Sequence, residues 1–293
     1  MSASGAVLSA LRARGKQVVI STLVGGLGNQ MFQYAAGRAL ALRRGCELQL
    51  DAGWLESGST VTYALGCFPI EAEVISAYRH RRRQRALELL GLAPPVRRHT
   101  AFRFDEEVLE LPGRIRLVGY WQSEKYFKDH EAAIRSEFTR KDPLDEPNVA
   151  TAAEIEAATA VCVHVRRGDY VSDRHINRYH GVLPLEYYIS AVELVLRSVP
   201  DAHFFVFSDD IGWCRANLSI GGQTTFVDHN RNQPADDLRL MALCRHHIIA
   251  NSTFSWWGAW LATAEDPIVI APKQWAVAED VGPDLIPKRW IRL

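Results

Sequence analysis

The stretch VCVHVRRGDYV, residues 161–171, indicates most about how this chain folds. Apolar residues alternate over its first half, as they do in a β-strand. The stretch continues with His164, two adjacent arginines and Asp169. Gly168 lets the backbone turn sharply after the strand. Because the arginine fork matches phosphate geometry, two in succession can neutralise a diphosphate without a metal. We therefore predict a strand that ends at an anion site, and the alternative is a surface Arg–Asp ion pair.

Around this stretch, short apolar runs alternate with helix-like spans. The runs lie at 160–165, 203–208, 224–228, 247–250 and 268–271. This alternation predicts a parallel, doubly wound sheet. Ligands of such sheets bind beyond the carboxyl ends of the strands. We therefore expect the polar residues that follow three of these runs to form one composite site.

The second of these strand ends carries two carboxylates, since Ser208 leads into Asp209 and Asp210. A carboxylate that accepts from two adjacent N–H groups would select guanine. We favour that interpretation over a Mg²⁺ or Mn²⁺ site, which needs more oxygen ligands. Helix capping by one of the two aspartates is the other alternative.

The third strand end opens a tryptophan-rich helix. Its residues are Asn251, Ser252, Thr253, Phe254 and Ser255. Hydroxyls and backbone N–H groups at a helix start favour a phosphate, and the alternative is an ordinary N-cap made by Ser252 or Thr253. We expect the tryptophans that follow, Trp256, Trp257 and Trp260, to pack in the core rather than against a sugar.

The first half of the chain opens with a βα unit. A strand from Val18 meets a glycine-rich turn, and a helix from about Asn29 to Arg44 ends at Gly45, before a strand at 46–51. The glycine spacing fits neither a dinucleotide-binding fingerprint nor a P-loop. It therefore predicts a tight turn between the strand and the helix. The functional alternative is that Asn29, at the start of the helix, forms a hydrogen bond with a substrate hydroxyl.

The rest of this half predicts a helical insertion over 54–98, a strand near 115–121 and a helix near 124–138. The proline-containing segment 142–147 then suggests a linker, which places the domain boundary after residue 147. The insertion carries a basic run, Arg79, Arg81, Arg82, Arg83 and Arg85. We expect a solvated face there, and the alternative is peripheral contact with an anionic inner membrane that carries a lipid-linked acceptor.

Composition limits the class of protein. A length of 293 residues suits two domains of about 150 residues each. The 34 basic and 34 acidic residues cancel, so no overall charge draws the chain to nucleic acid. The five cysteines show no zinc spacing, so we expect reduced thiols in a cytoplasmic protein. Residues 1–16 resemble neither a signal peptide nor a membrane span.

Four ordered segments together resemble the α-1,2-fucosyltransferases of glycosyltransferase family 11. They read GGLGNQMFQYAAGRALA from Gly25, HVRRGDYV from His164, FSDDIGWC from Phe207 and DLRLMALCRHHIIANSTFSWWGAWLA from Asp237. The resemblance implies an α/β fold of the GT-B type, with two Rossmann-like lobes and a cleft between them. Residues 1–147 would form the acceptor-side lobe, and residues 148–293 the lobe that binds the GDP-sugar.

The resemblance also implies an activity and a donor site. L-fucose would pass from GDP-β-L-fucose to the 2-hydroxyl of a terminal galactose of a glycan, with inversion and without a metal. The HxRRxD pattern, shared with protein O-fucosyltransferases and α-1,6-fucosyltransferases, makes Arg166 the principal diphosphate ligand. Arg167 and Asp169 would support the site, and His164 would lie near the nucleotide.

A GxxGNQ segment in the O-fucosyltransferases places Asn29, followed by Gln30, near the acceptor. For the acceptor proton, Asp169, Asp173, His175 and an oxygen of GDP itself all stay open. Because animal members carry an N-terminal membrane anchor that this sequence lacks, we expect a soluble bacterial enzyme. The alternatives are a transferase for another GDP-hexose and a non-catalytic module that binds GDP or glycan.

Overall fold

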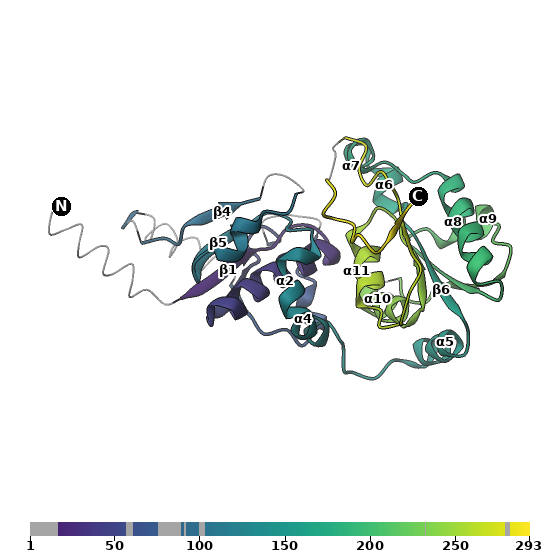
Figure 1. Cartoon of the computed structure of the whole chain (residues 1–293), viewed down its shortest axis with the longest axis horizontal. Coiled ribbons are helices and arrows are strands. Elements are labelled where there is room, and N and C mark those ends of the chain that lie inside the picture. The colour runs from purple at the N-terminus through teal and green to yellow at the C-terminus, as the bar shows by residue number, and fades with distance from the viewer. Residues whose placement is uncertain are drawn as a thin grey trace. The chain divides into compact units, whose positions relative to one another are not determined.

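The computed structural model divides the chain into two compact α/β units, one up to Thr139 and one from Arg140 (Figure 1). It describes residues 17–56, 61–75, 89–90, 92–99, 103–231, 233–278 and 282–293. The division falls before the predicted boundary at residue 147. The reason is that helix α5 (Glu146–Glu156) packs against the second unit, where its Ala152 and Ile155 join a core cluster.

The first unit is built on a five-stranded parallel sheet with the order β3-β2-β1-β5-β4. Its strands are β1 (Val18–Thr22), β2 (Glu47–Asp51), β3 (Glu73–Ile75), β4 (Val96–Arg98) and β5 (Arg114–Val118). The predictions for β1, β2 and β5 are confirmed. Central β1 is the most apolar of these strands, and its Val19 and Ile20 are buried.

Helix α2 (Leu27–Arg44) follows β1, as predicted, and packs against β1 and β2. Gly45 ends it in the left-handed conformation, with φ of 60°, and donates its N–H to the carbonyls of Ala41 and Leu42. Only glycine adopts this conformation without a steric cost, which explains why the helix ends there.

The predicted helix over 124–138 is interrupted. The structure has two 3₁₀ turns, η3 (Glu124–Tyr126) and η4 (Lys128–His130), before α4 (Glu131–Glu137). Phe127 separates the turns with a non-helical φ of −131°, and its fully buried ring packs 6.3 Å from that of Phe32. Packing in the core therefore overrides the helical pattern at this residue.

The predicted helical insertion over 54–98 is wrong for part of its length. Within the described residues, it contains the 3₁₀ turn η1 (Leu65–Cys67) and the edge strands β3 and β4. These strands have three residues each and are mostly exposed, so their sequence is too short to show a strand pattern. The basic run from Arg79 to Arg85 lies outside the described residues. A further 3₁₀ turn, η2 (Glu106–Glu110), precedes β5.

The second unit has a six-stranded parallel sheet with the order β11-β10-β9-β6-β7-β8. Its strands are β6 (Ala160–Val165), β7 (His203–Ser208), β8 (Gln223–Val227), β9 (His246–Ile248), β10 (Val269–Ala271) and β11 (Ile291–Arg292). All five predicted strands are confirmed. The sequence did not reveal β11, because two exposed edge residues carry no periodicity.

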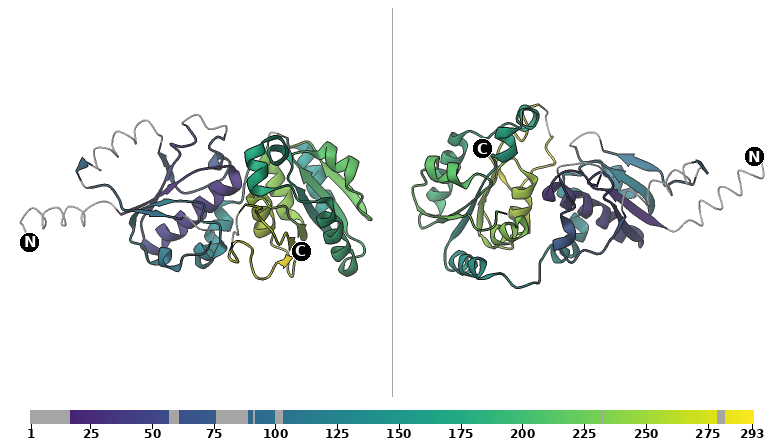
Figure 2. Two further views of the ribbon diagram at one scale, coloured as in Figure 1. Left: turned by 90° about the horizontal axis from the view of Figure 1, so that it is seen from above. Right: turned by 180° about the vertical axis from the view of Figure 1, so that it is seen from behind.

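Helices cover both faces of this sheet, as predicted for a doubly wound fold (Figure 2). Besides α5 they are α6 (Gly168–Ser172), α7 (Arg174–His180), α8 (Leu185–Ser198), α9 (Ile211–Asn217), α10 (Pro234–Leu243) and α11 (Thr253–Leu261). Residues of α8 and α9 pack on one face, and residues of α5 and α10 pack on the other. On α8, Tyr188, Val192 and Val195 form the buried stripe, whereas Ile189 is 41% exposed.

The three tryptophans of α11 are buried in the core, as predicted. The ring of Trp256 lies 5.0 Å from that of Trp257 and 6.1 Å from that of Trp260, and its indole N–H donates to the carbonyl of Leu285. None of the helices within the described residues is both long enough and apolar enough to span a membrane.

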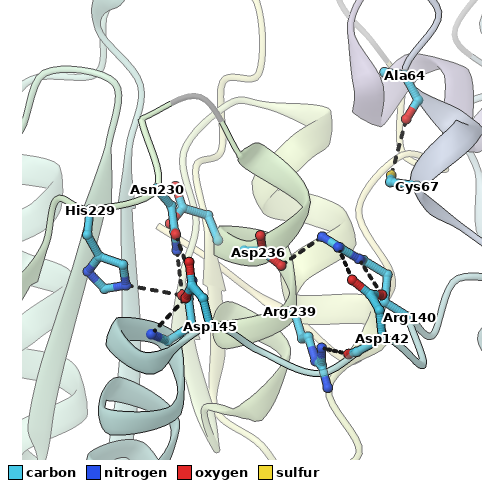
Figure 3. A network of polar contacts seen from close by, with 11 residues as sticks. Ala64, Cys67, Arg140, Asp142, Asp145, His229, Asn230, Asp236 and Arg239 are labelled. Carbon is cyan, nitrogen blue, oxygen red and sulfur yellow. Dashed lines mark hydrogen bonds and ion pairs between the residues drawn. The ribbon is translucent and has the colours of Figure 1, made fainter.

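The segment that enters the second unit is tied to α10 by polar contacts (Figure 3). Arg140 pairs with Asp236 at 2.7 Å and also with Asp142. Arg239 donates to the carbonyl of Asp142 at 2.7 Å. These bonds attach residues 140–142 to the second unit and explain why it begins at Arg140.

Candidate site in the second unit

The second sheet contains a topological switch point. From β6 the chain runs to β7 and β8 on one side, and it then crosses to β9 on the other side. The loops after β6 and β9 therefore diverge at the carboxyl edge of the sheet, which is where ligands bind in such folds. These two loops contain the predicted arginine pair and the predicted phosphate-binding segment.

Arg166 lies in the loop after β6 between two carboxylates. Its terminal nitrogens are 2.7 Å from Oδ1 of Asp169 and 3.0 Å from Oδ2 of Asp209. The guanidinium also lies 5.5 Å from the ring centre of Tyr170. Its side chain stays 31% exposed, and its buried Nε has no hydrogen-bond partner among the described residues. Arg166 is therefore held in place but keeps a donor for a further ligand.

Arg167 lies in different surroundings. Its guanidinium carbon is 3.8 Å from the ring centre of Trp213, and its Nε is 3.4 Å from Oδ2 of Asp210. Its backbone N–H donates to Oδ1 of Asp209 at 2.8 Å. The side chain is 17% exposed and packs along α9. Arg167 thus connects the loop after β6 to the loop after β7.

The acidic loop after β7 makes structural bonds. Asp210 caps α9 by accepting the N–H of Trp213 at 3.1 Å, which is the capping alternative. Ser208 Oγ accepts the N–H of Asp210 at 3.0 Å. Asp209 bonds to both arginines, as described above. Recognition of guanine by these aspartates stays a prediction, and it would compete with the bonds that each carboxylate already makes.

Three residues of the segment 251–255 hold the loop itself. The side-chain N–H groups of Asn251 donate to three carbonyls, those of His180, Gly181 and Trp275. Ser252 caps α11 by accepting the N–H of Phe254, as the N-cap alternative predicted. Ser255 is fully buried and donates to the carbonyl of Ala250 at 3.1 Å.

Thr253 and Phe254 are half-buried in the first turn of α11. Of the five predicted ligands, these two and the backbone N–H groups of that turn are therefore the candidates for contact with a phosphate. The hydroxyl of Tyr170 donates to the carbonyl of Asn251 at 3.0 Å. This bond joins the loop after β6 to the loop after β9, so the two sides of the switch point are held together.

His164 is the last polar side chain of β6, and it is buried, with its ring 5.5 Å from that of Phe254. Burial lowers its pKa to about 4, although the carboxylate of Asp209 acts in the opposite direction. The imidazole is therefore neutral near pH 7. Its Nδ1 has no hydrogen-bond partner within the described part of the chain.

The structure distinguishes the three side chains suggested for the acceptor proton. Asp169 contacts Arg166 directly. Asp173 caps α7 by accepting the N–H groups of His175 and Ile176, and these bonds lower its carboxyl pKa, which makes it a weaker base. The side chain of His175 is exposed on α7. Asp169 is thus the candidate in direct contact with the arginine cluster.

In the first unit, the two predicted acceptor residues differ in their contacts. Gln30 is fully buried, and its amide bonds to the carbonyls of Gly25 and Thr62 and to the N–H of Ala64. The side chain of Gln30 therefore fixes the loops that contain Gly25 and Thr62. Asn29 is half-buried, and its Oδ1 accepts an N–H of Gln122 at 2.9 Å.

The sequence analysis missed Gln122. The signal that could have revealed it is the polar pair Gln122-Ser123 directly after the predicted strand 115–121. Among the residues that the structure describes, no three His, Cys, Asp or Glu side chains gather in the manner of metal ligands. All five cysteines carry free thiols.

Comparison with known proteins identifies relatives over most of the chain. Residues 106–292 match the model of the family described as Glycosyl transferase family 11. An alpha-1,2-colitosyltransferase of Escherichia coli is 32% identical, covering 94% of this chain and 99% of that protein. A galactoside alpha-(1,2)-fucosyltransferase 2 of Bos taurus is 31% identical, covering 83% of this chain and 68% of that protein.

Solved structures support the GT-B fold. A mutant of Arabidopsis thaliana FUT1 in complex with GDP superposes with a TM-score of 0.54 at 10% identity, over 94% of this chain and 76% of that one. POFUT1 in complex with GDP gives 0.50 at 12% identity, over 87% and 98%. At such low identity the similarity shows the fold alone, which agrees with two parallel α/β sheets.

Proposed function

The chain belongs to glycosyl transferase family 11, and from that membership we propose that it transfers L-fucose from GDP-β-L-fucose to the 2-hydroxyl of a terminal galactose. We further propose that the reaction inverts the anomeric centre and needs no metal. The observation that carries the proposal is Arg166, which lies at the switch point of the second sheet with a buried donor that has no partner among the described residues.

The proposed chemistry is a single in-line displacement. The acceptor oxygen forms a bond to the anomeric carbon as the bond from that carbon to the β-phosphate breaks, through an oxocarbenium-like transition state. Negative charge then grows on the departing phosphate. Arg166 and the N–H groups of the first turn of α11 are the donors that would stabilise this charge.

The residues around Arg166 would keep it oriented for this task. Asp169 and Asp209 fix its two terminal nitrogens, and Asp209 also anchors the backbone of Arg167. When a diphosphate binds, its oxygens would replace part of this carboxylate pairing, since phosphate offers the same bidentate geometry. Asp169 would then be released from Arg166 and could accept the proton of the acceptor hydroxyl.

His164 would contribute without carrying charge. Burial keeps its imidazole neutral, so it could donate one hydrogen bond to the nucleotide without adding a second cation beside Arg166. Ser208, Asp209 and Asp210 would border the same nucleotide from the loop after β7.

Replacement of Arg166 tests the donor site. We expect Arg166→Ala to lower kcat about 10²- to 10³-fold, as the loss of one preorganised donor to a developing charge does in other enzymes. Transfer from GDP-fucose to lactose would be measured, with the linkage of the product determined. Arg215→Ala is the matched control, because Arg215 pairs with Asp228 on the exposed surface. Near-wild-type turnover by Arg166→Ala with its fold intact would refute the assignment.

A second donor deserves a direct test, because one relative of 32% identity is a colitosyltransferase. Colitose is the 3-deoxy form of L-fucose, so a site for one sugar nearly fits the other. Comparison of kcat/KM for GDP-fucose and for GDP-linked colitose would decide. A preference for the colitose donor would change the proposed donor and leave the GDP site unchanged.

A further inference from the structure

The first sheet has a topological switch point of its own. From β1 the chain runs to β2 and β3 on one side, whereas β5 and β4 lie on the other side. The loops after β1 and β5 therefore diverge at the carboxyl edge of this sheet. The first loop leads to Asn29, and the second contains Gln122.

The backbone of the loop after β5 is strained. Gly119 has φ of 149°, and Trp121 has φ of 54°, a conformation that a residue with a side chain rarely adopts. The surrounding structure enforces it, because the indole of Trp121 is fully buried, 4.8 Å from the ring of His99 and 5.6 Å from that of Tyr126. Strained residues of this kind persist where the surrounding structure enforces them, and they cluster at functional sites.

Buried side chains fix the two loops to each other. Gln33 accepts the N–H of Val24 at 2.9 Å with its Oε1 and donates to the carbonyl of Gly119 at 3.2 Å. Gln33 is fully buried. The loop after β1 and the loop after β5 therefore hold a fixed spacing.

The strained turn directs Gln122 to Asn29. Gln122 is 7% exposed and donates from its Nε2 to Oδ1 of Asn29 at 2.9 Å. Gly25 packs on the same amide, since an added Cβ at Gly25 would lie 2.5 Å from Nδ2 of Asn29. The orientation of the Asn29 amide is thus set, with its oxygen on Gln122.

We propose that Gln122 is a positioning residue for the acceptor sugar and acts through Asn29. This proposal rests on the proposed function, and on the resemblance to the O-fucosyltransferases, which implies that Asn29 lies near the acceptor. By holding Oδ1, Gln122 makes Nδ2 the end of the amide that donates to an oxygen of the galactoside. Tyr120, two residues before Gln122 in the chain and 39% exposed, adds an aromatic surface suited to a sugar ring.

The test is a double-mutant cycle with Gln122→Met and Asn29→Ala. Methionine keeps the length of glutamine and removes its donor. We expect Gln122→Met to lower kcat/KM for lactose about tenfold, the usual effect of one lost hydrogen bond. The KM for GDP-fucose, the slow hydrolysis of GDP-fucose in the absence of lactose, and Tm would stay unchanged. The double variant would lose no more than Asn29→Ala alone.

The matched control is Gln49→Met in the same unit, because Gln49 donates to Glu73 at 2.7 Å at the side of the sheet away from β5. It is expected to keep wild-type kinetics. Losses in the cycle that add, or a rise in the KM for GDP-fucose equal to the effect on lactose, would overturn the positioning role.

A binding measurement separates this proposal from the proposed function. If the wild-type protein transfers no sugar from GDP-fucose, the proposed function fails. Lactose binding in the presence of GDP, followed by saturation-transfer NMR, still decides the role of Gln122. Binding weakened about tenfold by Gln122→Met and unaffected by Gln49→Met supports the proposal, and equal binding by all three proteins refutes it.

Discussion

Arg166 and Arg167 are neighbours in the sequence but have different surroundings. Arg166 has two carboxylate partners that hold its tip at the carboxyl edge of the sheet. The guanidinium of Arg167 lies 3.8 Å from the ring centre of Trp213, and its side chain is mostly covered. A charged side chain that stacks on an aromatic ring contributes mainly to stability, whereas one with an unused buried donor is suited to binding. The pair therefore combines a support with a ligand.

This difference predicts how replacement of Arg167 acts. We expect Arg167→Ala to lower the free energy of unfolding by about 1 to 2 kcal/mol, because it removes the cation–π contact with Trp213 and the ion pair with Asp210. Urea denaturation of Arg167→Ala and Arg166→Ala side by side would measure it. Equal stability of the two variants would contradict the separate roles.

The buried imidazole of His164 makes stability depend on pH. Its folded pKa of about 4 lies below the ordinary value of 6.5, so the unfolded chain takes up a proton first as the pH falls. Stability from this group is present above pH 6.5 and is lost between pH 6.5 and about 4. The loss reaches up to about 2 kcal/mol at pH 5.

His164→Gln removes this titration. We expect urea denaturation at pH 7 and pH 5 to show a smaller loss of stability on acidification for the variant than for the wild-type protein. His247, whose pKa burial lowers to about 3, titrates in the same range and stays in both proteins. An identical loss in the two proteins would mean that His164 does not titrate as its burial implies.

At the level of elements, the loop between β6 and α6 depends on a close approach. A Cβ added at Gly168 would lie 2.7 Å from Oδ2 of Asp209, the oxygen that pairs with Arg166. We expect Gly168→Ala to displace this carboxylate and to reduce kcat/KM for GDP-fucose about tenfold. Gly212→Ala in α9 is the control, since a Cβ there meets nothing within 4 Å. Matching kinetics for the two variants would show that Asp209 can move without consequence.

Long or fully buried elements could be predicted from the sequence. Strand β6 alternates apolar residues, and α2 is bounded by glycines, so local pattern and final structure agree. The edge strands β3, β4 and β11 could not be predicted, because two or three polar or exposed residues form a strand only when a neighbour supplies the hydrogen bonds. Phe127 shows the same effect in a helix, where packing interrupts the pattern.

The same limit applies to the candidate site, where local sequence could be interpreted but contacts with distant residues could not. Charged residues after β6 and β7 identified the edge of the sheet. What the sequence could not show is that Asn251 bonds to carbonyls of His180, Gly181 and Trp275, which lie far along the chain. Gln122 was missed for this reason too, because its meaning comes from contact with Asn29.

At the scale of the whole molecule, the two units have separate sheets and separate cores. We expect calorimetry to resolve two unfolding transitions, since a chain with two separate cores often unfolds in more than one step. GDP at 100 times its Kd would stabilise only the second unit, by about 2.7 kcal/mol. A single transition that shifts as a whole with GDP would show that the units unfold together.

Each described sheet takes its strands from one continuous part of the chain, the first from Val18–Val118 and the second from Ala160–Arg292. During synthesis on the ribosome, the first sheet can therefore close before the strands of the second have emerged. Parallel sheets pair residues that are distant in sequence, so they form slowly. While they form, their unpaired strand edges are exposed to aggregation. The nascent polypeptide thus carries one unfinished sheet at a time, which limits its exposure to aggregation.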